Sequence, residues 1–138
     1  MVKPSTEYRS GRHCVFLLHA HLIFTPKYRK RVFDGIHIDA LRIIFAGVCE
    51  KFGVVLTEFN GEPDHVHLLV EFPPSVQLST LVNSLKGVSS RLLRTQYPEI
   101  DQSCWKGVLW SRSYFAASCG GAPLSIIKQY VEQQKKPA

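Results

Sequence analysis

The chain has 138 residues, of which 45% are hydrophobic, so it is long enough to fold as one compact domain with its own core. No apolar run approaches the roughly 20 residues that a membrane-spanning helix needs, and no apolar leader follows Met1, so we expect a cytoplasmic protein without a membrane segment. The formal net charge of +6 favours a polyanionic partner such as nucleic acid, although charge alone does not separate that reading from a basic protein with no such partner.

The spacing of apolar residues predicts the secondary structure in chain order. Strands are expected where short apolar or alternating runs occur, and helices where apolar residues step by three and four. The resulting order is a polar arm, a strand, a helix, two strands, a helix and a strand, over residues 1–12, 14–24, 37–52, 54–59, 65–72, 77–96 and 113–118. Gly53 is expected to end the first helix, and Asn60-Gly61 to make a turn between the two middle strands.

Residues beyond the last strand predict one more element. Pro123 suits the first turn of a helix, which is expected over residues 123–136 after the glycine pair Gly120-Gly121. Residues 97–111 are expected to form a loop. The strand and helix order β-α-β-β-α-β predicts an α+β fold of the ferredoxin-like, split βαβ type, with helices on one face of an antiparallel sheet. We therefore expect a single domain over residues 1–138, and this fold alone does not decide the function.

The chain contains four cysteines, none of them in a C-x-x-C pair: Cys14, Cys49, Cys104 and Cys119. Their spacing gives no support to a zinc site, and a chain of this size has a core without disulfides. We expect them to be reduced thiols that are mostly buried.

A possible metal site lies in the segment Asp64-His65-Val66-His67. Alternate side chains of a strand point to the same face, so His65 and His67 can ligate one ion while Val66 enters the core. Two imidazoles leave coordination positions open for substrate oxygens, as a catalytic metal requires. The same spacing recurs at His19-Ala20-His21, so spacing alone supports either pair, or two half-exposed histidines that bind no metal.

The predicted last helix carries a second candidate pair. Tyr130 and Gln134 are four residues apart and therefore neighbours on one helical face. An amide oxygen is a plausible ligand for a magnesium-like ion, and a tyrosine beside it is a plausible nucleophile. A surface helix with a boundary tyrosine and a solvated glutamine is the alternative.

Taken together, these motifs resemble a known family. TPKYR after the first strand, PDHVHLLV, the helix with LKG and RLL, the tryptophan-rich segment that ends in SYF, and YVEQQ occur in this order. The chain resembles the single-tyrosine HUH transposases of small insertion sequences (TnpA type) over about residues 13–134. The resemblance implies that His65 and His67 are metal ligands, that Gln134 is the third ligand and that Tyr130 is the nucleophile. Glu62 and Asp64 would orient the histidines, and His21 gains no ligand role.

The resemblance also implies an activity. Enzymes of this family cut single-stranded DNA at element ends, form a 5′-phosphotyrosine intermediate and rejoin strands without ATP, with Mg²⁺ or Mn²⁺ as cofactor. They recognise hairpins near those ends and act as homodimers, in which the tyrosine helix of one subunit can complete the site of the other. No G-x-x-x-x-G-K-[ST] loop is present, so no nucleotide cofactor is expected.

The positive charges and aromatic residues predict where DNA would lie. Contacts with the DNA backbone are expected from a cluster after the first strand and from the second long helix: Lys27, Arg29, Lys30 and Arg31, then Lys86, Arg91 and Arg94. Tyr28, Trp105, Trp110 and Tyr114 are candidates for stacking on unpaired bases, but Trp105 and Trp110 are better suited to the core or a dimer interface. Two other functions stay open: a rolling-circle-type HUH nickase, and a non-enzymatic nucleic-acid-binding module of the same fold.

Overall fold

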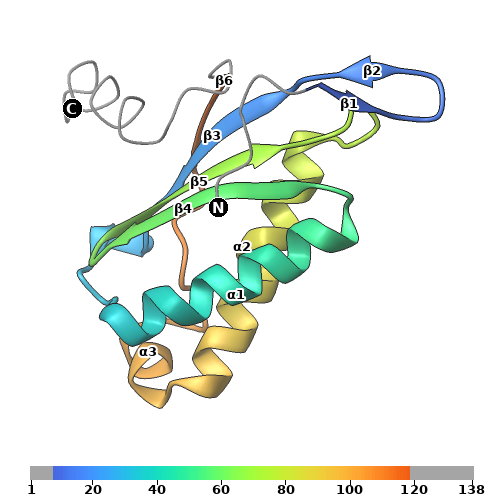
Figure 1. The fold of residues 1–138 in the computed structure, drawn as a ribbon. Helices are drawn as coiled ribbons and strands as arrows, with labels where there is room; N and C mark the ends of the chain where they lie inside the picture. The colour runs from blue at the N-terminus through green and yellow to red at the C-terminus, as the bar shows by residue number, and fades with distance from the viewer. Residues whose placement is uncertain (1–7, 119–138) are drawn as a thin grey trace.

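The computed structural model describes residues 8–118 of the protein (Figure 1). Along the chain these residues form β1 (Arg9–Ser10), β2 (Val15–Phe16), β3 (His19–Phe24), the 3₁₀ turn η1 (Lys27–Arg29), α1 (Gly35–Lys51), β4 (Val55–Glu62), β5 (His65–Glu71), α2 (Leu78–Gln96), α3 (Pro98–Ser103) and β6 (Phe115–Ser118). The predicted helix over 123–136, with Tyr130 and Gln134, lies outside the described residues, as does Cys119.

The main sheet has four strands in the order β4-β5-β3-β6, and every neighbouring pair is antiparallel. The two long helices α1 and α2 cover one of its faces (Figure 1). This is the ferredoxin-like α+β fold that the order of elements predicted. Among the described residues, no helix is both long enough and apolar enough to span a membrane.

The core lies between the sheet and these helices. Alternate residues of the two central strands belong to it, with Leu22 and Phe24 on β3 and Val66 and Leu68 on β5. The helix α1 adds the predicted stripe of Leu41, Phe45 and Val48, all of them buried. The residues that alternate with these core residues along each strand point to the opposite face of the sheet, which therefore carries a different set of side chains.

The buried face of α2 differs slightly from the predicted stripe. The three-four spacing of Leu78, Leu81, Leu85, Val88 and Leu92 would place Leu92 on the apolar face, but Leu92 is 38% exposed and Leu93 is buried in its place. Leu81, Leu85 and Leu93 define the buried face together with Ser89, whose hydroxyl accepts a hydrogen bond of 2.9 Å from the indole N–H of Trp110. A serine in the stripe is therefore stabilised by a buried tryptophan donor.

Asn60-Gly61 does not form the turn that the sequence predicted. Both residues belong to β4, and the chain reverses at Pro63-Asp64, between Glu62 and His65. The glycine is needed for a different reason, because a Cβ on Gly61 would lie 2.6 Å from Cγ2 of Ile38 on α1. The strand thus approaches the helix closely at a position where a side chain has no room.

Two further segments differ from expectation. The predicted strand over 14–24 divides into β2 and β3, and β2 pairs with β1 in a hairpin, so part of the polar arm over 1–12 is an ordered strand. The predicted loop over 97–111 begins with the short helix α3, which starts at Pro98, a residue well suited to a first helical position.

His37 joins α1 to α3, since its Nδ1 accepts the backbone N–H of Asp34 and its Nε2 lies 2.9 Å from Glu99 Oε2.

Candidate active site

His65 and His67 lie on the face of β5 opposite the helices, because Val66 and Leu68 point into the core. The neighbouring strands add residues to the same face: Glu62 is the register partner of His65, and Asn60 and Ile23 are partners of His67. The two imidazole rings are in edge contact, with centroids 4.9 Å apart. The predicted metal pair is thus brought together on one surface of the sheet.

His65 is oriented by the residue that precedes it. Its Nδ1 lies 2.7 Å from Oδ1 of Asp64, so a neutral His65 donates from Nδ1 and keeps its lone pair on Nε2. Asp64 Oδ2 lies 3.4 Å from Nη2 of Arg29. Partial burial raises the pKa of the Asp64 carboxyl, but the hydrogen bond from His65 and the electrostatic interactions with His65 and Arg29 outweigh this and hold the pKa below its usual range. A stable carboxylate at this position favours the Nδ1–H form of His65.

His67 is oriented by a residue of the neighbouring strand. Its Nδ1 lies 2.9 Å from Nε2 of His21, and the two rings stack with centroids 5.1 Å apart. Both histidines are buried, and His21 also contacts the ring of Phe115 edge-on. Sequence reasoning gave His21 no ligand role and did not foresee this contact. The two H-x-H segments hinted at such a contact, but only the register of β3 against β5 places His21 and His67 on the same face.

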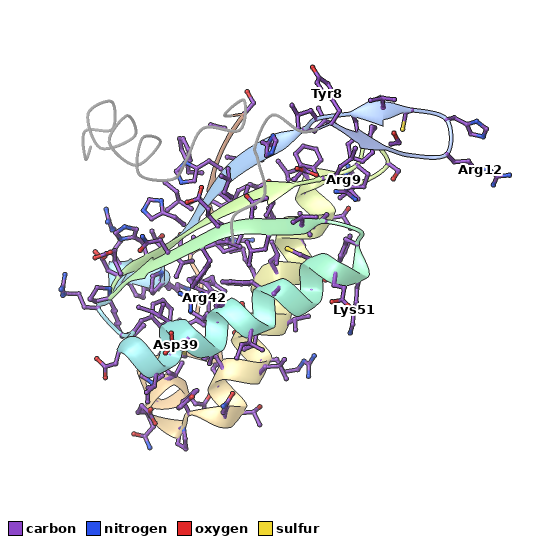
Figure 2. The ribbon with its side chains drawn as sticks, in the orientation of Figure 1. Tyr8, Arg9, Arg12, Asp39, Arg42 and Lys51 are labelled. Atoms are coloured by element: carbon purple, nitrogen blue, oxygen red, sulfur yellow. The ribbon has the colours of Figure 1, made fainter. Side chains whose placement is uncertain are left out.

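His19, in the other H-x-H segment, faces a buried carboxylate. His19 Nε2 lies 3.4 Å from Glu71 Oε2, and Arg9 Nε lies 3.3 Å from Glu71 Oε1. Arg9 belongs to the N-terminal hairpin (Figure 2) and also donates to the carbonyl of Gly53. His19 thus faces a carboxylate and His21 faces His67, which favours His65 and His67 as the metal pair of the two that spacing allowed.

The donor set of His65 and His67 fits a divalent metal. Nδ1 of His65 contacts Asp64, and Nδ1 of His67 contacts His21. Both histidines would therefore bind the metal through Nε2, as is usual for histidine ligands whose other nitrogen makes a hydrogen bond. Within residues 8–118, no group of three or more histidine, cysteine, aspartate or glutamate residues has the arrangement of a metal site. The predicted third ligand, Gln134, lies outside this range.

The predicted DNA-contacting residues differ in how they are placed. Arg29, Lys30 and Arg31 are exposed on and after η1, and Arg91 is exposed on α2. Lys86, by contrast, is half-buried, and its ammonium donates to the carbonyls of residues 111, 112 and 113. Burial lowers the pKa of Lys86. Lys86 therefore holds the loop before β6 as well as contributing charge.

The aromatic residues divide into a buried and an exposed group. Trp110 is 5% exposed and packs against Phe24 and Phe33, so its expected place in the core is confirmed. Trp105 is 59% exposed and Tyr28 is 70% exposed. Trp105 is therefore not a core residue, and its alternative place in a dimer interface stays a prediction. Cys14, Cys49 and Cys104 are free thiols, of which only Cys49 is fully buried.

Comparison with known proteins identifies the family. A family model described as "Transposase IS200 like" matches residues 14–134. The ISDra2 transposase TnpA of Deinococcus radiodurans is 34% identical over 128 residues, which cover 93% of this chain and 91% of that protein. The transposase for insertion sequence element IS200 of Salmonella typhimurium is 32% identical over 118 residues, covering 83% of this chain and 78% of its own.

Solved structures agree with the sequence relatives. A crystal structure of a candidate transposase from Deinococcus radiodurans superposes with a TM-score of 0.77 at 33% identity, covering 91% of this chain and 97% of that chain. The fold also resembles that of a REP-associated tyrosine transposase bound to a REP hairpin, with a TM-score of 0.58 at 11% identity over 90% of this chain and 68% of the other. The chain therefore belongs to the family of IS200-like transposases, and it is a DNA transposase.

Proposed function

We propose that this transposase cleaves and rejoins single-stranded DNA at the ends of an insertion sequence. Tyr130 is the nucleophile in this proposal, and His65, His67 and Gln134 hold a divalent metal. The observation that carries it is the matched orientation of the two histidines, since Asp64 and His21 engage Nδ1 of each ring and leave ligation to Nε2.

The reaction divides between the metal and the tyrosine. When bound at His65 and His67, Mg²⁺ or Mn²⁺ would polarise a non-bridging phosphate oxygen and offset the charge of the transition state. The Tyr130 phenol, with an ordinary pKa of about 10, loses its proton as its oxygen attacks phosphorus. The P–O3′ bond breaks, and the leaving oxygen takes a proton to become a free 3′-OH. Rejoining is the reverse attack by a 3′-OH on the 5′-phosphotyrosine, so the bond energy is conserved and no ATP is consumed.

Orientation of the histidines has a direct chemical consequence. Each ligand nitrogen must carry a lone pair, and in a neutral imidazole a hydrogen bond donated by Nδ1 leaves this lone pair on Nε2. Nδ1 of His65 donates to the Asp64 carboxylate, and Nδ1 of His67 donates when Nε2 of His21 is the acceptor. The Arg29 guanidinium keeps the Asp64 carboxylate charged, and Asp64 in turn orders His65. We propose that Glu62, the register partner of His65, supports the same ring from β4.

The proposed DNA partner is a single strand with a hairpin near the element end. The fold-related REP-associated transposase was solved bound to a REP hairpin. The exposed cations Arg29, Lys30 and Arg31 follow one another in this chain, and Arg29 contacts Asp64, the partner of His65. We propose that Lys27, Lys86 and Arg91 add to this positive surface. A homodimer is proposed, with Tyr130 and Gln134 of one subunit completing the His65 and His67 site of the other.

Incubation with end-labelled single-stranded DNA tests the metal site. A protein–DNA adduct should appear on a denaturing gel with Mg²⁺ or Mn²⁺, and should disappear with chelator and in His65→Ala and His67→Ala. A perfect duplex of the same sequence should not be cut. A rolling-circle-type nickase would share the adduct but fail to join two element ends, and a binding module would bind the DNA without any adduct or metal dependence.

A mixing experiment tests the shared site. A Tyr130→Phe chain and a His65→Ala, His67→Ala chain should each be inactive alone. If the site forms between subunits, the mixed dimer contains one intact site and recovers cleavage. A mixture that stays inactive after subunit exchange has been demonstrated would contradict the shared arrangement.

A further inference from the structure

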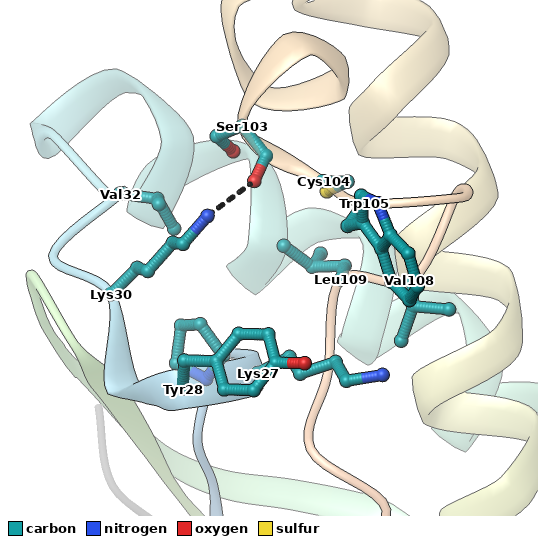
Figure 3. Close-up of a pocket in the computed structure, with 10 residues that line it drawn as sticks. Lys27, Tyr28, Lys30, Val32, Ser103, Cys104, Trp105, Val108 and Leu109 are labelled. Carbon is teal, nitrogen blue, oxygen red and sulfur yellow. Dashed lines mark hydrogen bonds between the residues drawn. The ribbon is translucent and has the colours of Figure 1, made fainter.

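Two loops at one end of the molecule meet in a shallow pocket between residues 26–32 and 103–109, here called the Trp105 pocket (Figure 3). We propose that the Trp105 pocket binds an unpaired nucleotide of single-stranded DNA, with its base stacked on Trp105 and Tyr28 and its phosphate contacted by Lys27 and Lys106. The inference rests on the proposed function, because it assumes that single-stranded DNA is the substrate. The cleft between the loops is narrow, so the base is placed on the exposed rings and not inside the cleft.

The exposure of the rings is the first observation. Large aromatic side chains are usually well buried, and Trp110 in the same segment follows that rule. Trp105 and Tyr28 instead expose 59% and 70% of their surface. Every nucleobase has a flat face that can stack on an exposed ring, and such stacking does not depend on base sequence.

The charges around the rings are the second observation. The Lys27 ammonium lies 5.5 Å from the centroid of Tyr28 and 5.7 Å from that of Trp105, so one cation bridges both rings. The Lys106 ammonium lies 4.5 Å from the Trp105 centroid. Lys30 donates to the carbonyl of Ser103 (Figure 3), and none of the pocket-lining residues within the described range 8–118 carries a carboxylate. Exposed aromatic rings can stack on a base, and the ammonium groups between them can contact the adjoining phosphate.

The backbone holds these side chains in place before any ligand binds. Tyr28, Arg29 and Lys106 have positive φ angles of 65°, 51° and 53°, a conformation that non-glycine residues rarely adopt. Hydrogen bonds from Lys27 N to Leu109 O, at 2.9 Å, and from Ser111 N to Thr25 O, at 2.8 Å, tie the two loops together. Unfavourable backbone conformations persist where the surrounding structure enforces them, and they gather at ligand sites.

Arg29 connects the Trp105 pocket with the candidate metal centre. Arg29 directly follows Tyr28, and its guanidinium lies 3.4 Å from the Asp64 carboxylate, which in turn binds His65. A strand whose scissile phosphate lies at His65 and His67 can therefore place a nearby unpaired nucleotide on Trp105. The pocket would then hold the strand that is cut.

Fluorescence anisotropy with a 5′-labelled oligothymidylate, which forms no hairpin, tests the proposal. The full chain is used with chelator present, so that binding is measured without cleavage. Trp105→Ala should weaken binding by about 5- to 150-fold, the effect of losing one stacked base, whereas Trp105→Phe should retain most of the affinity. Tyr8→Ala is the matched control, because Tyr8 is a 68% exposed aromatic residue on the N-terminal hairpin, outside the pocket (Figure 2). It should bind as the unchanged protein does.

An abasic oligonucleotide of the same length separates stacking from charge. Trp105→Ala should lose its effect on this probe, whereas Lys27→Gln and Lys106→Gln should weaken binding to both probes and reduce its salt dependence. Normal binding of oligothymidylate by Trp105→Ala, or an equal loss on the abasic strand, would overturn the proposal. Trp105-dependent binding in this assay, combined with no covalent adduct on single-stranded element-end DNA when Mg²⁺ or Mn²⁺ is supplied, would instead refute the cleavage proposal and leave the pocket intact.

Discussion

Replacing His21 by phenylalanine tests the orientation of the metal pair. His21→Phe keeps a flat ring, and with it the stacking on His67 at 5.1 Å and the edge contact with Phe115 at 5.8 Å. The substitution removes the nitrogen that lies 2.9 Å from Nδ1 of His67. It therefore changes one polar contact in a buried site while preserving most of the packing.

Two effects should follow from this loss. A buried polar atom deprived of a hydrogen bond lowers the free energy of unfolding by about 1–3 kcal/mol. Removal of a residue that orients a metal-bound histidine weakens metal binding by about 10- to 100-fold. Both effects are expected in His21→Phe because His21 is fully buried and no water replaces the lost nitrogen easily.

Urea unfolding and Mn²⁺ titration followed by electron paramagnetic resonance measure the two effects separately. His19→Phe is the control, since His19 lies on the same strand face but contacts Glu71 and not His67. This control should bind Mn²⁺ as the unchanged protein does, whatever its stability. A folded His21→Phe variant with undiminished Mn²⁺ affinity would refute the role assigned to His21.

Three further outcomes are expected. Gly61→Ala should lower the free energy of unfolding by about 1–3 kcal/mol through overlap with α1, whereas Gly87→Ala, where a Cβ meets no atom within 4 Å, should be neutral or stabilising in urea unfolding. Burial raises the pKa of Cys49 to about 12, so mass spectrometry should find this thiol unalkylated at pH 8 until the protein unfolds. The His37 hydrogen bond holds the pKa of Glu99 below its ordinary 4.5, so stabilisation by this pair is present above that pH and is lost as the pH falls through the lower folded value. In Glu99→Gln, the midpoint temperature of thermal unfolding should therefore fall less as the pH is lowered.

The fold was predictable because it depends on local periodicity. Alternation on the strands and three-four spacing on the helices identify the elements, and their order allows few topologies. The turn predicted at Asn60-Gly61 was wrong because the sequence does not tell why a glycine is needed. Gly61 is required by the close approach of Ile38 and not by a turn. The exposure of Trp105 could not be predicted for a similar reason, since it depends on how the loops over 26–32 and 103–109 meet.

The candidate site was predictable in part. The spacing of His65 and His67 and the acid before them point to one face of one strand, and the structure confirms that placement. The contact between His21 and His67 depends on the register between β3 and β5, in which His67 pairs with Ile23 and His21 pairs with Leu69, so that the two histidines are diagonal neighbours. The residue pattern within one β-strand does not determine its register against another strand. Tyr130 and Gln134 stay predictions that follow from the family resemblance.

Identification of the residue that becomes joined to DNA tests the central claim most directly. The adduct formed with single-stranded DNA and Mg²⁺ would be digested with protease and nuclease and mapped by mass spectrometry. A 5′-phosphonucleotide on Tyr130, with loss of the adduct but not of DNA binding in Tyr130→Phe, is the predicted result. An adduct on Tyr114 or Tyr97, or one that persists in Tyr130→Phe, would contradict the account.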